Sequence, residues 1–277
     1  MTFEPDELVR SRADLAGTLR ALRRRAGISQ TRLAARCNMS QTKISNIEGA
    51  KIVPALVDVE LILAALDVPP ELVADTVVLA RRANTEWQDV WSQRRTGLEK
   101  KQNELAGLER SSTEFRYFLL SMVTGLLATP AYVRASLAHV PGDQSRAIAR
   151  KLERQTVLYD TSKSFTFLLT EQAVRWPFLP RAAMAVQIDH LASVSRLPNV
   201  RLGVIPLAGH IPSAPLNTFT VYDARIATVE TQTGAMVFRG HADVSAYLRD
   251  FAELRNAALF DQECRVWLNA WADRFRS

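Results

Sequence analysis

The chain has 277 residues, of which 47% are hydrophobic, so it is long enough for two domains and too apolar for a disordered protein. Its net charge is +6, and residues 10–51 hold ten lysines and arginines against Asp14 and Glu48, a concentration typical of a polyanion-binding surface. We expect a cytoplasmic protein without membrane contact, because no apolar run approaches about 18 residues and the acidic N-terminus lacks the apolar core of a secretory signal.

The N-terminal part, residues 1–83, is predicted to form short helices only. Leucines at helical spacing indicate a first helix that ends at Gly27. Serines that can act as N-caps precede a second helix over 30–37 and a third over 41–48, with a tight turn between them. A fourth helix is expected to open at Pro54, and a fifth helix follows it.

The third predicted helix has one apolar and one polar side. On a helical wheel Ile44 and Ile47 point in one direction, and short hydrogen-bonding side chains suited to base edges lie on the other side. The predicted base-contacting residues are Gln41, Thr42, Ser45 and Asn46. Lys43 and Lys51 lie at the margins, where they are predicted to contact phosphates. A short helix, a tight turn and a reading helix form a helix-turn-helix; the alternative is a polar surface helix in a helical bundle.

Residues 14–68 resemble the xenobiotic-response-element (Cro/C1-type) helix-turn-helix domains. The resemblance rests on LRALRRRAGISQTRLAARCNMSQTKISNIEGAK, on Pro54 and on the ILAALDVP ending. It implies base contacts by Gln41, Thr42 and Asn46 and phosphate contacts by Gln30 and Lys51. It also implies a structural pair between Arg23 and Glu48, which we expect to be partly exposed and worth about 0.2–1 kcal/mol.

One detail departs from that family. After the acidic residue that ends the reading helix, family members usually have any residue, then glycine, then a basic residue. Here the order is Gly49, Ala50, Lys51, so a different turn is expected after the helix.

The rest of the chain predicts a mixed domain. Residues 84–110 are polar and helix-prone and are predicted to form a connecting helix. The strand candidates beyond it are FRYFLLSMV, TFLLTEQAV, NVRLGVIPL, NTFTVYD and IATVETQT. The expected helices are 130–138, 143–160, 180–196, 242–259 and 261–275. The predicted fold is therefore an all-α N-terminal helix-turn-helix domain joined by a helix to an α+β C-terminal domain, residues 111–277.

This second part resembles the C-terminal domain of WhiJ-type, antitoxin-like actinobacterial regulators. The matching features are Glu109, GLLATPAYVR (125–134), residues 176–206, His210, Phe219 and ATVET (227–231). Family members commonly have Gln-Thr-Pro where this chain has Ala128-Thr129-Pro130. The resemblance implies a cytoplasmic DNA-binding regulator, often encoded beside a very small partner protein.

Five polar residues in the matching segments define a candidate ligand or partner pocket. They are Glu171, Gln187, His190, His210 and Glu230. The alternative is that these side chains tie strands to helices by hydrogen bonds. The four histidines have no metal-ligand spacing, and the sequence has no nucleophile-elbow, phosphate-loop or dinucleotide-binding motif. We therefore expect no metal, no cofactor and no enzymatic activity.

These observations predict a sequence-specific transcriptional regulator, autoregulated and controlled through its C-terminal domain by a small protein or a ligand. Its expected partner is double-stranded DNA with an inverted-repeat operator, bound by a homodimer whose interface comes from the C-terminal helices. A first rival is an antitoxin-like protein that sequesters a small partner encoded nearby, with DNA binding secondary. A second rival is an enzyme fused to a DNA-binding domain.

Overall fold

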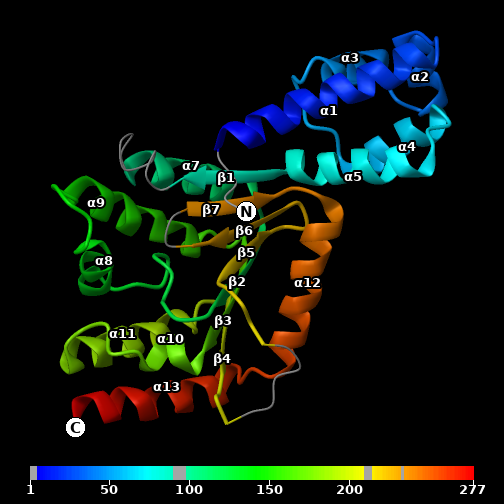
Figure 1. Cartoon of the computed structure of the whole chain (residues 1–277). Coiled ribbons are helices and arrows are strands. Elements are labelled where there is room, and N and C mark those ends of the chain that lie inside the picture. The colour runs from blue at the N-terminus through cyan, green and yellow to red at the C-terminus, as the bar shows by residue number, and fades with distance from the viewer. Residues whose placement is uncertain (1–4, 90–97, 209–213, 232–233) are drawn as a thin grey trace. The chain divides into compact units, whose positions relative to one another are not determined.

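The computed structural model describes residues 5–89, 98–208, 214–231 and 234–277 (Figure 1). The chain divides into two compact units. The first comprises Met1–Asp89 with Gly234–Val244, and the second comprises Val90–Thr233 with Ser245–Ser277. In the described residues, no helix is both long and apolar enough to cross a membrane.

The first unit consists of five helices and a two-stranded ribbon. The helices are α1 (Pro5–Arg25), α2 (Gln30–Arg36), α3 (Gln41–Glu48), α4 (Leu56–Ala65) and α5 (Pro70–Asn84). The ribbon pairs β1 (Thr85–Asp89) with β7 (Gly234–Phe238) in antiparallel register. Ser29 and Ser40 cap α2 and α3 as predicted, because their side chains accept hydrogen bonds from the Arg32 and Lys43 backbone amides at 3.2 and 3.1 Å.

The predicted helix-turn-helix is present in this unit. Asn38 has a φ of +53°, the left-handed conformation that lets the chain turn sharply between α2 and α3. Leu33 of α2, Ile44 and Ile47 of α3 and Ile62 of α4 are each no more than 1% exposed and form one core. The apolar side of α3 therefore faces the core, as the helical wheel predicts.

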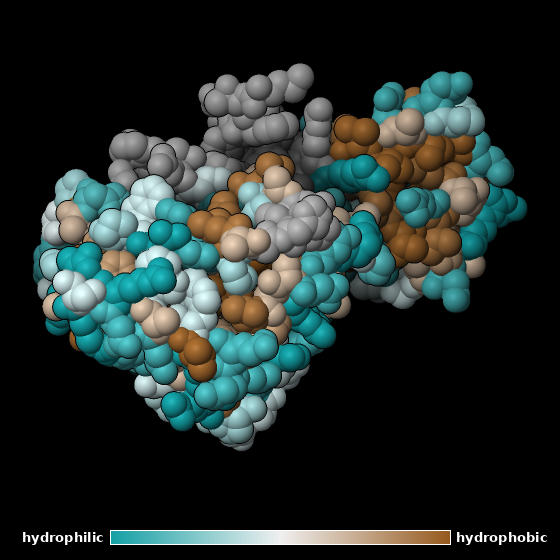
Figure 2. Space-filling model, turned by 90° about the horizontal axis from the view of Figure 1, so that it is seen from below, coloured by the Kyte–Doolittle hydropathy of each residue, from teal (hydrophilic) through white to brown (hydrophobic). Residues whose placement is uncertain are grey.

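The surface of the first unit carries exposed apolar side chains. Figure 2 shows them gathered on one side of this unit, at the right of the view. Val57 and Leu61, one helical turn apart on α4, are 57% and 46% exposed. Exposed apolar surface of this kind is common where proteins associate.

The second unit has a sheet with helices on both faces (Figure 1). Its strands are β2 (Glu114–Leu119), β3 (Ser164–Thr170), β4 (Val200–Ile205), β5 (Phe219–Tyr222) and β6 (Ile226–Glu230). Its helices are α7 (Leu98–Ser111), α8 (Pro130–Leu137), α9 (Ser145–Arg154), the 3₁₀ helix η1 (Gln155–Tyr159), α10 (Glu171–Arg175), α11 (Arg181–Val194), most of α12 (His241–Asn256) and α13 (Asp261–Arg276). The strand order is β6-β5-β2-β3-β4, with β2, β3 and β4 parallel and the other pairs antiparallel.

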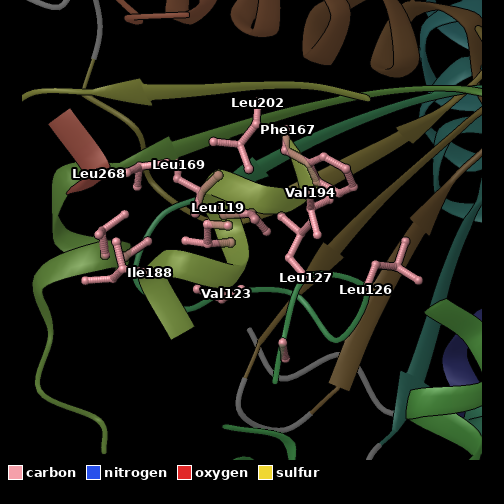
Figure 3. Packing of buried hydrophobic residues seen from close by; sticks show 14 of the residues in the cluster. Leu119, Val123, Leu126, Leu127, Phe167, Leu169, Ile188, Val194, Leu202 and Leu268 are labelled. Carbon is pink, nitrogen blue, oxygen red and sulfur yellow. The ribbon is translucent and has the colours of Figure 1, made fainter. Parts of the chain in front are cut away.

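One face of this sheet forms the main core. Leu119, Leu169 and Leu202 of the three parallel strands pack with Ile188 of α11 and Leu268 of α13 (Figure 3). All five are no more than 3% exposed, and α11 and α13 also pack extensively against each other. On the other face Phe219 of β5 contacts Tyr247 and Phe251 of α12, with ring centroids 5.0 and 6.4 Å apart.

The predicted fold class, an all-α domain followed by an α+β domain, is confirmed. Two of its details are wrong. The helix expected over 84–110 is not continuous, since residues 85–89 form β1 and the helix α7 begins only at Leu98. The strand expected over 166–174 ends at Thr170, whose side chain accepts from the Ala173 amide at 3.3 Å and caps α10.

Candidate functional site

The polar side of α3 is open to solvent at its start. Gln41 and Thr42 are exposed, while Ser45 and Asn46 further along the helix are half-buried. These are the four residues predicted to contact bases, and the structure places all of them away from the buried Ile44 and its neighbours. Their side chains carry amide and hydroxyl groups that can donate to and accept from a ligand.

A chain of hydrogen bonds holds the start of α2 and of α3 in place. Arg23 Nε and Nη2 donate to the two carboxylate oxygens of Glu48 at 2.6 and 2.8 Å. Gln30 Nε2 donates to Glu48 Oε2 at 2.8 Å, and Gln41 Nε2 donates to Gln30 Oε1 at 3.1 Å. The predicted partners Arg23 and Glu48 are thus in contact, and their pair also orients Gln30 and Gln41. Arg20, which sequence reasoning missed, donates to the Glu48 carbonyl.

Glu48 is ionised in this network although it is buried. Burial by itself raises its pKa, but the hydrogen bonds from Arg23 and Gln30 and the charges of Arg23 and Arg20 outweigh burial, so the pKa lies below its usual value. Its side chain is only 3% exposed and that of Arg23 is 12% exposed. The pair is therefore more buried than the sequence led us to expect.

The turn after α3 explains the departure from the family pattern. Gly49 keeps a negative φ and ends the helix, and Ala50 takes the left-handed conformation with a φ of +54°. A Cβ on Gly49 would lie 3.1 Å from the Ser45 carbonyl oxygen, so glycine serves close packing there. Lys51 follows this turn with its side chain exposed.

The two lysines predicted to contact phosphate differ in their surroundings. Lys43 Nζ lies 2.8 Å from Asp58 Oδ1 of α4, so its charge already has a partner within the protein. Lys51 has no salt bridge in the described part of the chain and is the freer of the two cations.

Two of the five predicted pocket residues make hydrogen bonds that hold the fold. Glu171 accepts from Arg175 and from the Leu207 amide, both at 2.8 Å. Gln187 is fully buried; it accepts from the Thr129 amide at 2.7 Å and donates to the Leu127 carbonyl at 2.8 Å. Both residues therefore tie segments of the fold together, which is the alternative reading of the sequence.

Of the remaining three residues, the structure describes two. His190 is half-buried on α11, and burial lowers its pKa. His210 lies outside the described residues. Glu230, at the end of β6, lines a cavity of about 1130 Å³ in the second unit, together with Tyr117, Thr220 and Thr228, which the sequence analysis did not single out.

Metal ligation finds no support in the described segments. No group of three or more histidine, cysteine, aspartate or glutamate side chains there could hold a metal ion. The two cysteines, Cys37 and Cys264, are buried and unpaired, and burial raises the pKa of both thiols, which keeps them protonated.

Comparison with protein families finds one match in each part of the chain. Residues 102–270 match a domain of unknown function, DUF5753. The chain belongs to this family. Residues 14–75 match a helix-turn-helix domain, a module that indicates a DNA-binding regulator. A comparison with curated protein sequences finds no match.

Comparison with solved structures finds only distant similarity. NucT from Helicobacter pylori matches with 8% identity and a TM-score of 0.39, over 63% of this chain and 97% of its own. A phospholipase D family member, Nuc from Salmonella typhimurium, matches with 8% identity and a TM-score of 0.34, over 57% and 89%. TrmBL2, an archaeal chromatin protein, matches with 11% identity and a TM-score of 0.33, over 64% and 53%.

Proposed function

We propose that the chain is a sequence-specific transcriptional regulator that reads double-stranded DNA with α3. The observation that carries this proposal is the polar side of α3, which rests on the chain of hydrogen bonds from Arg23 through Glu48 and Gln30 to Gln41. Side chains that are held in place before binding lose less conformational freedom on binding. The basic block around this helix adds the attraction for phosphate that DNA-binding proteins need.

In this proposal the helix separates two kinds of contact. Gln41, Thr42 and Asn46 meet base edges, with Ser45 beside them, because their short amides and hydroxyls donate and accept. Lys51 and the start of α2 at Gln30 meet phosphate. Lys43 reaches phosphate only by giving up its ion pair with Asp58.

The finer parts of the proposal concern assembly and control. The protein acts in the cytoplasm as a homodimer on an inverted-repeat operator, regulates its own synthesis and is not an enzyme. The family domain receives the signal, either from a small protein encoded nearby or from a ligand. The resemblance to WhiJ-type regulators supports a partner protein, and an antitoxin-like role in which sequestering that partner comes first remains the rival.

Selection from random duplexes tests the proposal directly. Sequencing the DNA retained by the purified full chain should give an inverted repeat. Asn46→Ala should then cost about 1–3 kcal/mol on that sequence and little on random DNA. Lys51→Ala should weaken both equally and reduce the salt dependence of log K by about one per half-site. If no sequence is enriched, or if Asn46→Ala weakens both duplexes alike, α3 does not read bases.

A separate measurement distinguishes the rival. Sequestration would be favoured over regulation if a very small protein co-purifies in a stoichiometric amount and no sequence of high affinity is enriched in its absence.

A further inference from the structure

The cavity in the second unit lies against the sheet. It measures about 1130 Å³ and is lined by residues of β2, β5 and β6, of α8 and α9, and of the segment 120–125. That volume is slightly above the usual range for small-molecule sites, about 300–1,000 Å³.

The floor of the cavity is chemically unlike the rest of the sheet. Strand register places Tyr117 opposite Thr220 and Thr220 opposite Thr228, so three hydroxyl groups form a row across β2, β5 and β6. In the same row β3 and β4 carry Phe167 and Leu202. Strands β5 and β6 are buried, and buried strands are normally apolar on both faces. The change to hydroxyls is thus confined to the part of this face that borders the cavity.

These hydroxyl groups are poorly satisfied within the protein. The Tyr117 hydroxyl is buried; it interacts with the neighbouring Tyr222 hydroxyl but makes no hydrogen bond of normal geometry. Thr220 and Thr228, each 8% exposed, also make no side-chain hydrogen bond within the described part of the chain. Buried polar groups without partners are costly and rare in native structures. A ligand that supplies the missing bonds would remove this cost.

The Tyr117 hydroxyl is positioned as a donor. Its ring stacks on Phe167 with centroids 4.9 Å apart and meets Tyr222 edge-on at 6.4 Å, which fixes its direction. Burial, followed by the neighbouring Tyr222 and Glu109, raises the pKa of Tyr117 well above its usual value, so the phenol stays protonated.

The charges around the cavity are balanced. Lys151, Arg154 and Glu230 line it and all have interaction partners. Arg154 also pairs with the buried carboxylate of Glu109 through Nε at 3.0 Å. Two positive and two negative groups leave no excess charge, so neither an anionic nor a cationic ligand gains from the local field.

Part of the remaining lining is apolar. It includes Val123, Tyr132, Val133 and Phe178, which offer contact area to a hydrocarbon or aromatic body. A polar floor and an apolar wall suit an amphipathic molecule.

We propose that this cavity binds an uncharged small molecule with an apolar body and at least two hydrogen-bonding oxygen atoms. Tyr117 donates to one oxygen, and Thr220 and Thr228 bond the other. This inference names the chemical class of the effector. Its regulatory meaning rests on the proposed function. The binding step itself needs no DNA.

The test uses three probes on one fluorinated naphthalene scaffold, observed by ¹⁹F relaxation in the presence of the full chain. The first carries a hydroxyl and a ketone, the second a carboxylate and the third an alkylammonium group. We expect saturable binding of the hydroxy-ketone below about 1 mM and at least about tenfold weaker binding of the charged probes.

Hydroxyl-deleting variants then locate the probe. Tyr117→Phe and Thr228→Val should each weaken the hydroxy-ketone about three- to tenfold, the range of one hydrogen bond. Tyr159→Phe is the matched control, because Tyr159 is 69% exposed and does not line the cavity. The melting temperature without probe should change little for Tyr117→Phe, since the lost hydroxyl makes no hydrogen bond of normal geometry there.

Two results would overturn the inference. One is the absence of saturable hydroxy-ketone binding to the intact chain, or a preference for a charged probe. The other is unchanged hydroxy-ketone affinity in Tyr117→Phe and Thr228→Val. Operator selection is measured on the same protein without probe, so a failure to bind DNA would count against the proposed function and leave the cavity result standing.

Discussion

Ala50 holds a backbone conformation that favours glycine. With a φ of +54° it lies in the left-handed region, which costs an L-residue roughly 1–2 kcal/mol. The glycine next to it, Gly49, does not have the left-handed conformation. Its missing Cβ instead allows the chain to pass close to the Ser45 carbonyl. The unusual order of the two residues therefore leaves strain at the end of the reading helix.

Ala50→Gly should stabilise the first unit by about 0.5–1 kcal/mol, because relief of the strain exceeds the added freedom of the unfolded chain. Thermal or urea unfolding measures the gain. At the neighbouring position, Gly49→Ala should destabilise the first unit, since the added Cβ would lie 3.1 Å from the Ser45 carbonyl oxygen. A loss of stability in Ala50→Gly would contradict the left-handed conformation of this turn.

Arg23 has a larger role than its sequence suggests. It bonds both Glu48 oxygens and the Ile28 carbonyl at 2.8 Å, and the carboxylate is 3% exposed. Removing one partner of a buried pair leaves an uncompensated charge. The expectation of a partly exposed pair worth about 0.2–1 kcal/mol is therefore too low.

Arg23→Ala should cost about 3 kcal/mol of unfolding free energy. The exposed Arg24→Ala, next to it on α1, is the matched control and should change stability by no more than about 0.5 kcal/mol. Chemical denaturation of both variants decides the matter. Equal, small losses would mean that Glu48 is solvated in solution.

At the scale of elements, the segment 120–129 lines much of the cavity but belongs to no strand or α-helix. Side chains from neighbouring helices hold it in place. The Tyr132 hydroxyl accepts from the Val123 amide at 3.1 Å, and Gln155 donates to the Gly125 and Ala128 carbonyls at 2.8 and 2.7 Å. Gln187 bonds the Thr129 amide and the Leu127 carbonyl from α11. Three elements thus shape one cavity wall.

Gln187→Leu should cost about 2–4 kcal/mol, because it leaves a buried amide and a buried carbonyl unpaired. Gln262→Leu, on the exposed start of α13, is the control and should be nearly neutral. Hydrogen exchange of the segment 120–129 should quicken in Gln187→Leu alone. Unchanged exchange would show that Tyr132 and Gln155 suffice to hold it.

The elements themselves were largely predictable from local signals. Ser29 and Ser40 mark the starts of α2 and α3, and apolar runs mark β2 and β4. The strands β1 and β7 were missed, since TEWQD and GAMVF are short and their pairing joins residues far apart in the chain. The hydroxyl row of the cavity was missed for the same reason: only the register across β2, β5 and β6 brings it together.

At the scale of the whole molecule, the structure offers a second candidate for the expected dimer interface. The C-terminal helices were expected to supply it, but α13 buries Leu268, Ala272 and Phe275 in its own unit. Val266 is its large exposed apolar side chain, 57% exposed. The first unit offers the exposed apolar pair Val57 and Leu61 on α4.

If the dimer forms through α4, a negative charge introduced on this helix should disrupt it. Leu61→Glu should convert the protein to a monomer, as measured by light scattering at micromolar concentration. It should also weaken binding to an operator with two half-sites far more than binding to a single half-site, because paired half-sites require paired reading helices. Burying an unpaired carboxylate in an interface is strongly unfavourable. Val266→Glu on α13 is the control and should leave the dimer intact. Dissociation by Val266→Glu alone would restore the C-terminal helices as the interface, and a monomeric wild type with operator present would remove the dimer altogether.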